Sequence, residues 1–205
     1  NSLMGIMSSI SMFVTMFLSP FSGSIVDKLN RKWVLVGMDL LQSVIMLTVG
    51  VLAYTERLNV PMVLIAAFLA AFGSVFYSPA ASSVMLDIIP RDDLIRGQSI
   101  FSGASSFINL VGSAISGLLV ATLGVPLIVI LNGLSNLYSA LSELFVTVPK
   151  SINQGEEITV VRILKDTKSA VKTIFSEPCL KIFVPCALII NLLGAGAFTL
   201  MLPFC

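Results

Sequence analysis

Charge is scarce in this sequence. Only 11% of the 205 residues are Asp, Glu, Lys or Arg and 56% are hydrophobic, whereas a soluble domain carries about 25% charged residues. So few charges cannot cover a water-facing surface, so a soluble globular domain is excluded and the surplus apolar side chains are expected to meet lipid. The 12 basic and 11 acidic residues leave a net charge of +1, which excludes the basic field that nucleic-acid binding needs.

Histidine is absent and cysteine is rare. The lack of histidine removes the commonest general base and metal ligand. The three cysteines, Cys179, Cys186 and Cys205, follow no paired spacing, so neither a disulfide framework nor a zinc or haem motif is predicted. A nucleophile motif and a glycine-rich phosphate loop are also missing. We therefore expect no enzyme activity, no metal and no cofactor.

Long uncharged runs separate short charged clusters. The longest run, 97–142, holds 46 residues and fits two crossings, because one helix needs roughly 20 residues to span the hydrocarbon. Gly124 and Pro126 predict the turn that divides it. The runs are continuously apolar rather than alternating, which predicts helices and not barrel strands. The sequence thus predicts an all-α, polytopic membrane helix bundle with six spans, at 3–22, 33–54, 60–84, 99–122, 126–148 and 182–205.

The charged clusters orient these spans. The connection at 23–32 carries three cations and one anion, and the segment 150–181 carries six cations. The positive-inside rule therefore predicts that both, with the connection at 87–98, lie in the cytoplasm. Within 156–176, apolar residues recur at helical spacing between basic ones, which predicts an amphipathic helix at the membrane surface. A solvated connecting helix is the alternative.

The first charged connection carries a motif. Residues 23–32 read Gly-Ser-Ile-Val-Asp-Lys-Leu-Asn-Arg-Lys, which resembles the loop signature of the major facilitator superfamily, G-x-x-x-D-[RK]-x-G-[RK]-[RK]. The matching positions are Gly23, Asp27, Lys28, Arg31 and Lys32. Asn30 stands where the second glycine would be, and asparagine is expected to accept the same left-handed turn. Gly23 is expected to let two helix ends approach closely.

The resemblance implies a larger organisation. In that superfamily the signature lies between spans 2 and 3. Residues 1–149 would then hold spans 2 to 6 of the N-terminal half, 150–181 the central cytoplasmic loop, and 182–205 the first helix of the C-terminal half. The bundle would be incomplete, and both ends of the chain read as fragment ends. Segments 78–94 and 112–119 also resemble the branch that contains macrolide and enterobactin exporters.

The resemblance also implies roles for the charges. In the family, the signature aspartate sits against a helix of the other half and helps to hold the outward-open state, a role that would fall to Asp27. The signature arginine pairs with an acid at the cytoplasmic end of span 4, which here matches Arg31 with Asp87. Asp87 and the signature residues thus form a predicted conformational-switch loop. The alternative is that they are ordinary anchor charges at the membrane surface.

Two acids lie inside predicted spans, Asp39 and Glu143. A carboxylate at this depth is expensive and is a functional hypothesis by default, here proton coupling or contact with a cation. The alternative is a structural role, with Lys28, Arg31 or Lys32 as partners of Asp39 and Lys150 as the partner of Glu143.

Amides and glycines within the spans are further candidates. Gln42, Asn109 and Asn136 lie at depths suited to a substrate cavity, although polar side chains in membrane helices also join helices together. Gly103, Gly112 and Gly117 lie in a span rich in small residues, and we expect them to act as hinge or packing positions.

These features predict a multi-pass transporter of the plasma membrane. It would be a secondary active transporter that exports small amphipathic or apolar compounds, drug-like or macrolide-like, by alternating access. An ion gradient would drive it, with H⁺ as the expected coupling ion. Its partners would be the lipid bilayer, the small-molecule substrate and the remaining spans, with no nucleic acid. The alternative is a truncated, membrane-embedded structural or partner protein without transport activity of its own.

Overall fold

The computed structural model describes residues 2–146 together with Ser176, Phe183, Pro185 and Cys186. The chain divides into two units, 1–158 and 159–205, and the fold below is that of the first unit. Nearly all of the predicted amphipathic helix and of the span at 182–205 lies outside the described residues.

The described part of the chain is all helix. It consists of α1 (Ser2–Lys28), α2 (Arg31–Tyr54), α3 (Val60–Ile88), a short 3-10 turn η1 (Arg91–Asp93) and α4 (Leu94–Phe145). Each of the four α-helices is long and apolar enough to cross a membrane. The predicted all-α membrane bundle is therefore confirmed.

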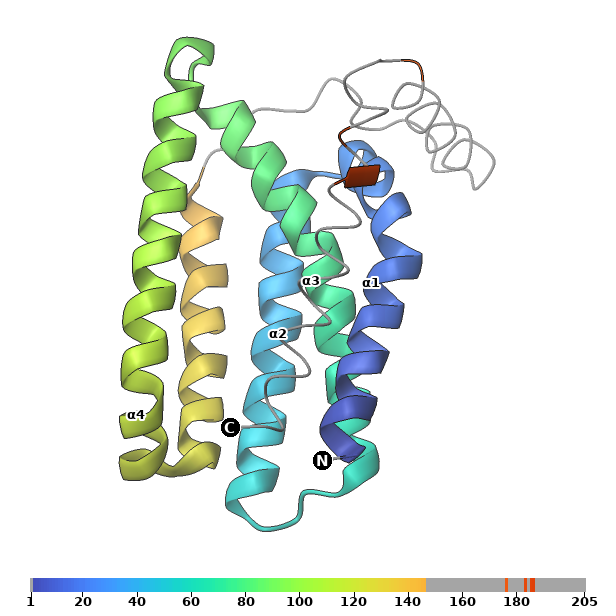
Figure 1. Cartoon of the computed structure of the whole chain (residues 1–205), viewed down its shortest axis with the longest axis vertical. Coiled ribbons are helices and arrows are strands. Elements are labelled where there is room, and N and C mark those ends of the chain that lie inside the picture. The colour runs from blue at the N-terminus through green and yellow to red at the C-terminus, as the bar shows by residue number, and fades with distance from the viewer. Residues whose placement is uncertain (1, 147–175, 177–182, 184, 187–205) are drawn as a thin grey trace. The chain divides into compact units, whose positions relative to one another are not determined.

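Helix α4 is a hairpin of two arms. Its 52 residues are interrupted at Gly124, whose backbone has φ 74° and ψ 157°, a conformation that glycine adopts without steric cost. The first arm, 94–123, and the second arm, 125–145, run antiparallel on either side of this turn (Figure 1). The division of the longest apolar run at Gly124 is as predicted, and the described residues thus hold five crossings.

The connections at the charged end are shorter than predicted. Helix α1 continues to Lys28 and α2 begins at Arg31, so only two residues of the expected 23–32 connection are not helical. The connection expected at 87–98 likewise shrinks to 89–93, because α3 continues to Ile88. The expectation failed because a change from apolar to charged residues marks the lipid boundary, while a helix with solvated or paired charges continues past it.

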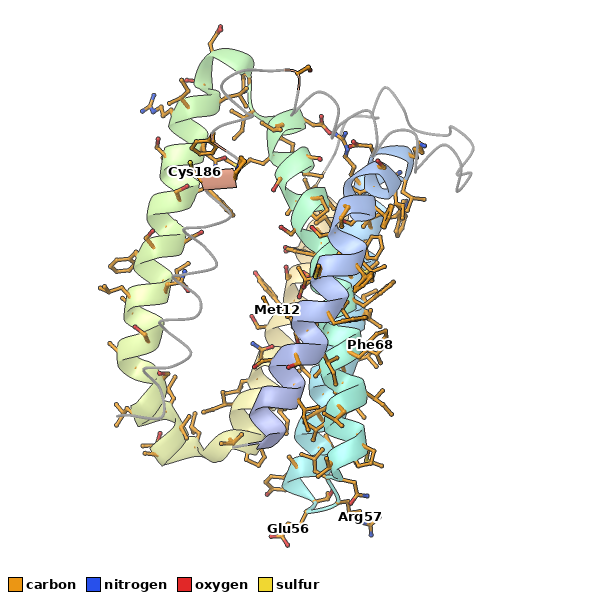
Figure 2. The ribbon with its side chains drawn as sticks, turned by 45° about the vertical axis from the view of Figure 1, so that its right-hand side comes forward. Met12, Glu56, Arg57, Phe68 and Cys186 are labelled. Carbon is orange, nitrogen blue, oxygen red and sulfur yellow. The ribbon has the colours of Figure 1, made fainter. Side chains whose placement is uncertain are left out.

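Alternate crossings place chain-distant segments at the same end of the bundle. The end of α1, the start of α2, the end of α3 and the end of α4 meet at one end, which we call the charged end (Figure 1). Glu56 and Arg57, in the connection between α2 and α3, lie at the opposite end (Figure 2). The predicted common side of the first two charged connections agrees with this arrangement.

The helices pack together in two places. Near the charged end, Val26 of α1, Leu35 of α2 and Phe76 of α3 belong to one buried cluster. Helix α2 also packs closely on the second arm of α4 through Gly50 and Gly133. Small residues such as these let membrane helices approach closely. Helix α2 packs against both α3 and α4 and therefore lies at the centre of the described packing.

Large apolar side chains cover the outside of these helices. Met12 of α1 and Phe68 of α3, both labelled in Figure 2, are 68% and 46% exposed. The buried residues of α4 are Gly133 and Ala140, both in its second arm. An apolar outer surface of this kind suits contact with lipid or with further helices, as expected of a membrane bundle.

Candidate functional site

The guanidinium group of Arg31 joins two other helices at the charged end. Its Nη2 atom donates to Oδ1 of Asp27, at the end of α1, over 2.8 Å. Its Nη1 atom donates to Oδ2 of Asp87, near the end of α3. The Arg31 side chain is 14% exposed, so both ion pairs are partly shielded from water on the side of the guanidinium. The structure thus brings together the Arg31 and Asp87 that the family resemblance matched.

Lys32 joins the fourth helix to the same end. Its Nζ atom donates to the backbone carbonyl of Leu144, 2.7 Å away, in the last turn of α4. A cation suits this position because the final carbonyls of a helix lack intrahelical partners and carry partial negative charge. Consecutive residues Arg31 and Lys32 therefore connect α2 to α1, α3 and α4. Nearby Lys28 is buried, with 6% of its surface exposed.

We expect the Lys32 contact to contribute measurably to stability. Changing Lys32→Met keeps the length of the side chain but removes the donor, leaving the Leu144 carbonyl without its charged partner. The expected loss is about 1 kcal/mol, measured as the thermal unfolding midpoint of the purified protein in detergent. Lys32→Arg keeps a donor and serves as the control. Equal midpoints for Lys32→Met and the parent would contradict a stabilising role.

One expectation about the signature residues is wrong. Asn30 has φ −74° and ψ 105°, an extended and not a left-handed conformation. Its side-chain oxygen accepts a hydrogen bond from the backbone N–H of Lys32 at 3.2 Å, so Asn30 caps the start of α2. Asparagine is a preferred N-cap residue. Asn30 therefore begins α2 by capping its first turn, and not by adopting the left-handed conformation expected at the glycine position.

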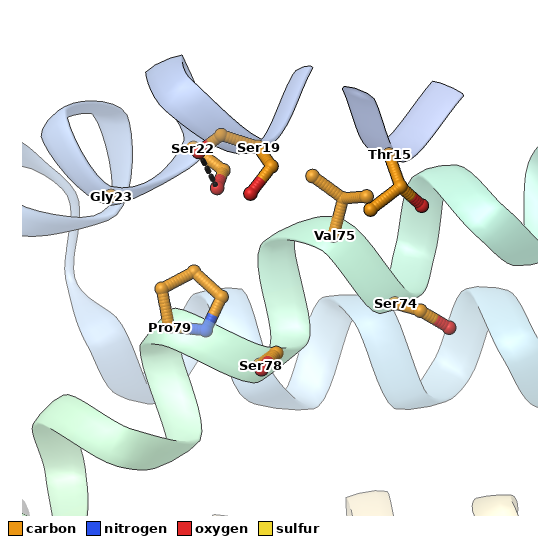
Figure 3. Close-up of a pocket in the computed structure, with 8 residues that line it drawn as sticks. All are labelled: Thr15, Ser19, Ser22, Gly23, Ser74, Val75, Ser78 and Pro79. Atoms are coloured by element: carbon orange, nitrogen blue, oxygen red, sulfur yellow. Dashed lines mark hydrogen bonds between the residues drawn. The ribbon is translucent and has the colours of Figure 1, made fainter. Parts of the chain in front are cut away.

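Gly23 does not mediate a close helix contact among the described residues. A Cβ atom placed on it would meet nothing within 4 Å. Instead it lies at the edge of a pocket of about 360 Å³ between α1 and α3 (Figure 3). Thr15, Ser19 and Ser22 of α1 line one side of this space, and Ser74, Val75, Ser78 and Pro79 of α3 line the other. Five of its eight lining residues carry a hydroxyl group.

A second pocket, the inner pocket, lies between α2, α3 and the second arm of α4. It has a volume of about 540 Å³. Nine of its ten lining residues are polar, the exception being Met46; they include Asp39, Gln42, Tyr77, Asn132, Asn136 and Ser139. The Asn136 amide donates to Oδ1 of Asn132 over 3.3 Å. Such a lining can exchange hydrogen bonds with a ligand, and it includes neither cysteine nor histidine.

The two intramembrane acids lie on either side of Tyr77. Asp39 is buried, with 7% of its surface exposed, and it lines the inner pocket together with Tyr77 and Ser139. The Tyr77 hydroxyl lies 3.5 Å from Oε1 of Glu143 and donates toward it. The other carboxylate oxygen of Glu143 is buried and has no hydrogen-bond partner among the described residues.

Two of the three predicted cation partners of Asp39, Arg31 and Lys32, are engaged elsewhere. Arg31 binds Asp27 and Asp87, and Lys32 binds the Leu144 carbonyl. Among the residues the structure describes, Asp39 takes part in no ion pair. Lys150, the predicted partner of Glu143, lies outside them.

The remaining candidates divide clearly. Gln42 and Asn136 both line the inner pocket, whereas Asn109 is exposed on the first arm of α4 and lines none of the pockets described here. The packing role predicted for three glycines of that arm is not seen within the described residues, because a Cβ atom at any of them would meet nothing within 4 Å. They are Gly103, Gly112 and Gly117.

Sequence reasoning missed the glycines that do permit close contact. A Cβ atom on Gly133 would lie 2.9 Å from the backbone nitrogen of Leu47, and one on Gly50 would lie 2.6 Å from Cγ1 of Ile130. The backbone carbonyl of Gly133 also accepts a hydrogen bond from the buried Ser43 hydroxyl at 2.8 Å. Ser43, Leu47 and Gly50 follow one another on α2 at offsets of four and three residues. This spacing places them on one face of the helix, which was the signal available in the sequence.

Comparison with known proteins gives the family. The model of the Major Facilitator Superfamily matches residues 1–204. The chain is 26% identical to macrolide efflux protein A of Enterococcus faecalis over 131 residues, which cover 64% of the chain and 41% of that protein. It is 30% identical to BacE of Bacillus subtilis, a candidate bacilysin exporter, over 128 residues, which cover 62% of the chain and 31% of that protein.

The chain spans about a third to two fifths of the length of the curated relatives it matches. The family match, however, extends over nearly all of its residues, and the long apolar helices agree with it. The chain is therefore a multi-pass plasma-membrane segment, and it belongs to the Major Facilitator Superfamily.

Proposed function

We propose that this chain forms part of an exporter of small amphipathic or apolar molecules that works by alternating access. Similarity to macrolide efflux protein A and to BacE supports export and a small-molecule substrate. The observation that carries the proposal is the two-way ion pair of Arg31 with Asp27 and Asp87. Alternating access needs contacts at helix ends that hold one state and can be broken in the other.

The charged end would act as the conformational latch. While Arg31 binds both carboxylates, the ends of α1 and α3 are held beside the start of α2. These pairs are only partly buried, since the Asp27 and Asp87 side chains are 47% and 27% exposed. Water can therefore replace either partner at moderate cost, which suits a contact that must open in each transport cycle.

We further propose that H⁺ is the coupling ion and that Glu143 carries it. The carboxylate lies in a membrane helix, has one oxygen without a partner among the described residues, and receives the Tyr77 hydroxyl on the other. A carboxylic acid in such surroundings exchanges a proton more readily than any other ion that a single carboxylate could hold. No covalent chemistry is required of any residue.

The test is drug accumulation in cells. Expression of the gene that encodes this chain, in a bacterial host lacking its main efflux pumps, is expected to lower the accumulation of radiolabelled erythromycin. A protonophore should restore accumulation, and Glu143→Gln should reduce export while leaving the amount of protein in the membrane unchanged. Glu56→Gln, an exposed carboxylate at the opposite end, serves as the control.

Two results would contradict this proposal separately. Unchanged accumulation across erythromycin and a panel of other amphipathic drugs would argue against export. Export that persists with a protonophore, or in the Glu143→Gln variant, would argue against coupling to H⁺ through this residue.

A further inference from the structure

Three pockets of the described helices adjoin one another in series. The pocket of about 360 Å³ between α1 and α3, which we call the outer pocket, shares Ser74 and Ser78 of α3 with the inner pocket. A third pocket, of about 270 Å³, shares Tyr77 with the inner pocket and is also lined by Glu143. The side chains of α3 at positions 74, 77 and 78 therefore separate neighbouring pockets, and Glu143 lies at the end of the series.

The lining of the outer pocket suits water. Its hydroxyl groups include that of Ser22, which is buried with 3% of its surface exposed. One water molecule needs about 10–15 Å³ and two to four polar partners, so the pocket can hold several. Thr15 and Ser19 are exposed and share a face of α1 with Ser22 (Figure 3). Water therefore has a route into this pocket from the surface of the described helices.

The polar space continues from the outer pocket into the inner pocket. Ser74 and Ser78 are both exposed and lie one helical turn apart on α3, so their hydroxyl groups can contact water on either side. Asp39 is the charged group of the inner lining, and it takes part in no ion pair within the described residues. A buried carboxylate without a cation is costly unless water or another donor solvates it, which favours water in the inner pocket as well.

The Tyr77 hydroxyl connects the inner pocket with Glu143. It lies 3.5 Å from Oε1 of Glu143 and donates toward it. A hydroxyl group can accept and donate at once. A hydronium ion in the inner pocket can therefore give a proton to the Tyr77 oxygen while the proton already there passes to the Glu143 carboxylate. Water, an unchanged tyrosine and a carboxylic acid result.

The third pocket offers water fewer partners. Six of its nine lining residues are apolar, and its charged groups are Lys32 of α2 and Glu143 itself. Asp39, in the inner pocket, is the other charged group in the linings that meet at Tyr77. The polar route to Glu143 among the described residues thus runs through the inner pocket.

We propose that a water-filled path crosses α3 at Ser74 and Ser78 and delivers protons from the outer pocket to Glu143 through the Tyr77 hydroxyl. Proton delivery rests on the proposed function, in which Glu143 carries the coupling H⁺. The water path depends only on the pockets and their hydroxyl groups, so it can be tested apart from transport.

Thiol labelling tests the water path. In the product of the gene that encodes this chain, with its own cysteines replaced by serine, Ser19→Cys and Ser78→Cys are made one at a time. Phe17→Cys is the control, because Phe17 lies at the depth of Ser19 but is exposed on the opposite face of α1. A cationic methanethiosulfonate reagent attacks thiolates in water, so both serine positions should label at least about tenfold faster than Phe17→Cys. Equal rates for Ser78→Cys and Phe17→Cys would overturn the path.

Proton movement tests delivery. In liposomes that contain the pH-sensitive dye pyranine, an erythromycin gradient should drive protons through the parent protein. Ser74→Val with Ser78→Val should slow this movement at least about tenfold, since a positioned proton-transfer group contributes about 10²–10⁴-fold. Ser74→Thr with Ser78→Thr has nearly the same shape but keeps both hydroxyl groups, and it should stay within about threefold of the parent. Tyr77→Phe should be as slow as the valine pair.

The results separate this proposal from the proposed function. If protons move equally fast in the valine and threonine pairs, or in Tyr77→Phe and the parent, coupling to H⁺ stands and the path across α3 is wrong. If the parent shows no erythromycin-driven proton movement, coupling to H⁺ and proton delivery both fail, while rapid labelling of Ser78→Cys still establishes the water path.

Discussion

Replacing Arg31 by aspartate is expected to abolish transport, because Arg31 alone pairs with both Asp27 and Asp87 among the residues that the structure describes. The change removes both ion pairs and leaves three carboxylates, at positions 27, 31 and 87, at adjoining helix ends. We expect a loss of about 2 kcal/mol in the stability of the latched state. This is less than the about 3–5 kcal/mol of a fully buried pair, because Asp27 is half exposed. A shift of this size moves the equilibrium between conformations more than tenfold.

The reversal of both charges makes this prediction specific. Arg31→Asp combined with Asp87→Arg restores the pair between α2 and α3, but the new aspartate then faces Asp27 four residues earlier, a repulsive arrangement. Rescue of transport should therefore be partial. Adding Asp27→Asn should bring it closer to the parent. Erythromycin accumulation measures the outcome, and equal failure of single, double and triple variants at normal expression would show that these charges do not act as a latch.

Substituting valine for Gly133 should produce the largest loss of stability. A Cβ atom there would lie 2.9 Å from the backbone nitrogen of Leu47 and 2.8 Å from its Cγ. The backbone nitrogen cannot yield by a side-chain rotation, so α2 and the second arm of α4 must separate. Overpacking of this kind costs about 1–3 kcal/mol. Separation would also weaken the hydrogen bond from Ser43 to the Gly133 carbonyl.

Gly112→Val is the matched control for Gly133→Val. Both positions are in α4, but a Cβ atom at Gly112 meets nothing within 4 Å. The midpoint of thermal unfolding in detergent should fall for Gly133→Val and change little for Gly112→Val. The reverse order would mean that the first arm, and not the second, carries the critical packing.

The fold was largely predictable from the sequence because lipid imposes two constraints. Every crossing must be helical and long enough to span the hydrocarbon, so uncharged runs locate the helices, and Gly124 with Pro126 locates the turn between the arms of α4. The exact helix ends were not predictable, because charge marks the membrane surface while capping decides where a helix stops. Asn30 shows this: its side chain begins α2 by accepting the Lys32 N–H.

The candidate site was predictable only where both partners carry charge. The pairing of Arg31 with Asp87 followed from a motif. The partner of Lys32 did not, because Lys32 binds a backbone carbonyl and every residue has a backbone carbonyl. Similarly, Gly50 and Gly133 look like Gly103 and Gly112 in sequence, yet they differ in whether another helix lies against them. The position of Tyr77 beside both Asp39 and Glu143 was not predictable, because it depends on how three helices are rotated about their axes.

The cross-links at the charged end give α1 the mechanics of a lever. Asp27 ties the last turn of this helix to Arg31, while Val14 and Val26 are its buried apolar contacts along α3. A 27-residue helix is about 40 Å long at 1.5 Å per residue, so a tilt of about 10° about the Asp27 end displaces the other end by about 7 Å. A rotation too small to break the ion pair at the pivot is thus enough to change the width of the bundle on the opposite face of the membrane.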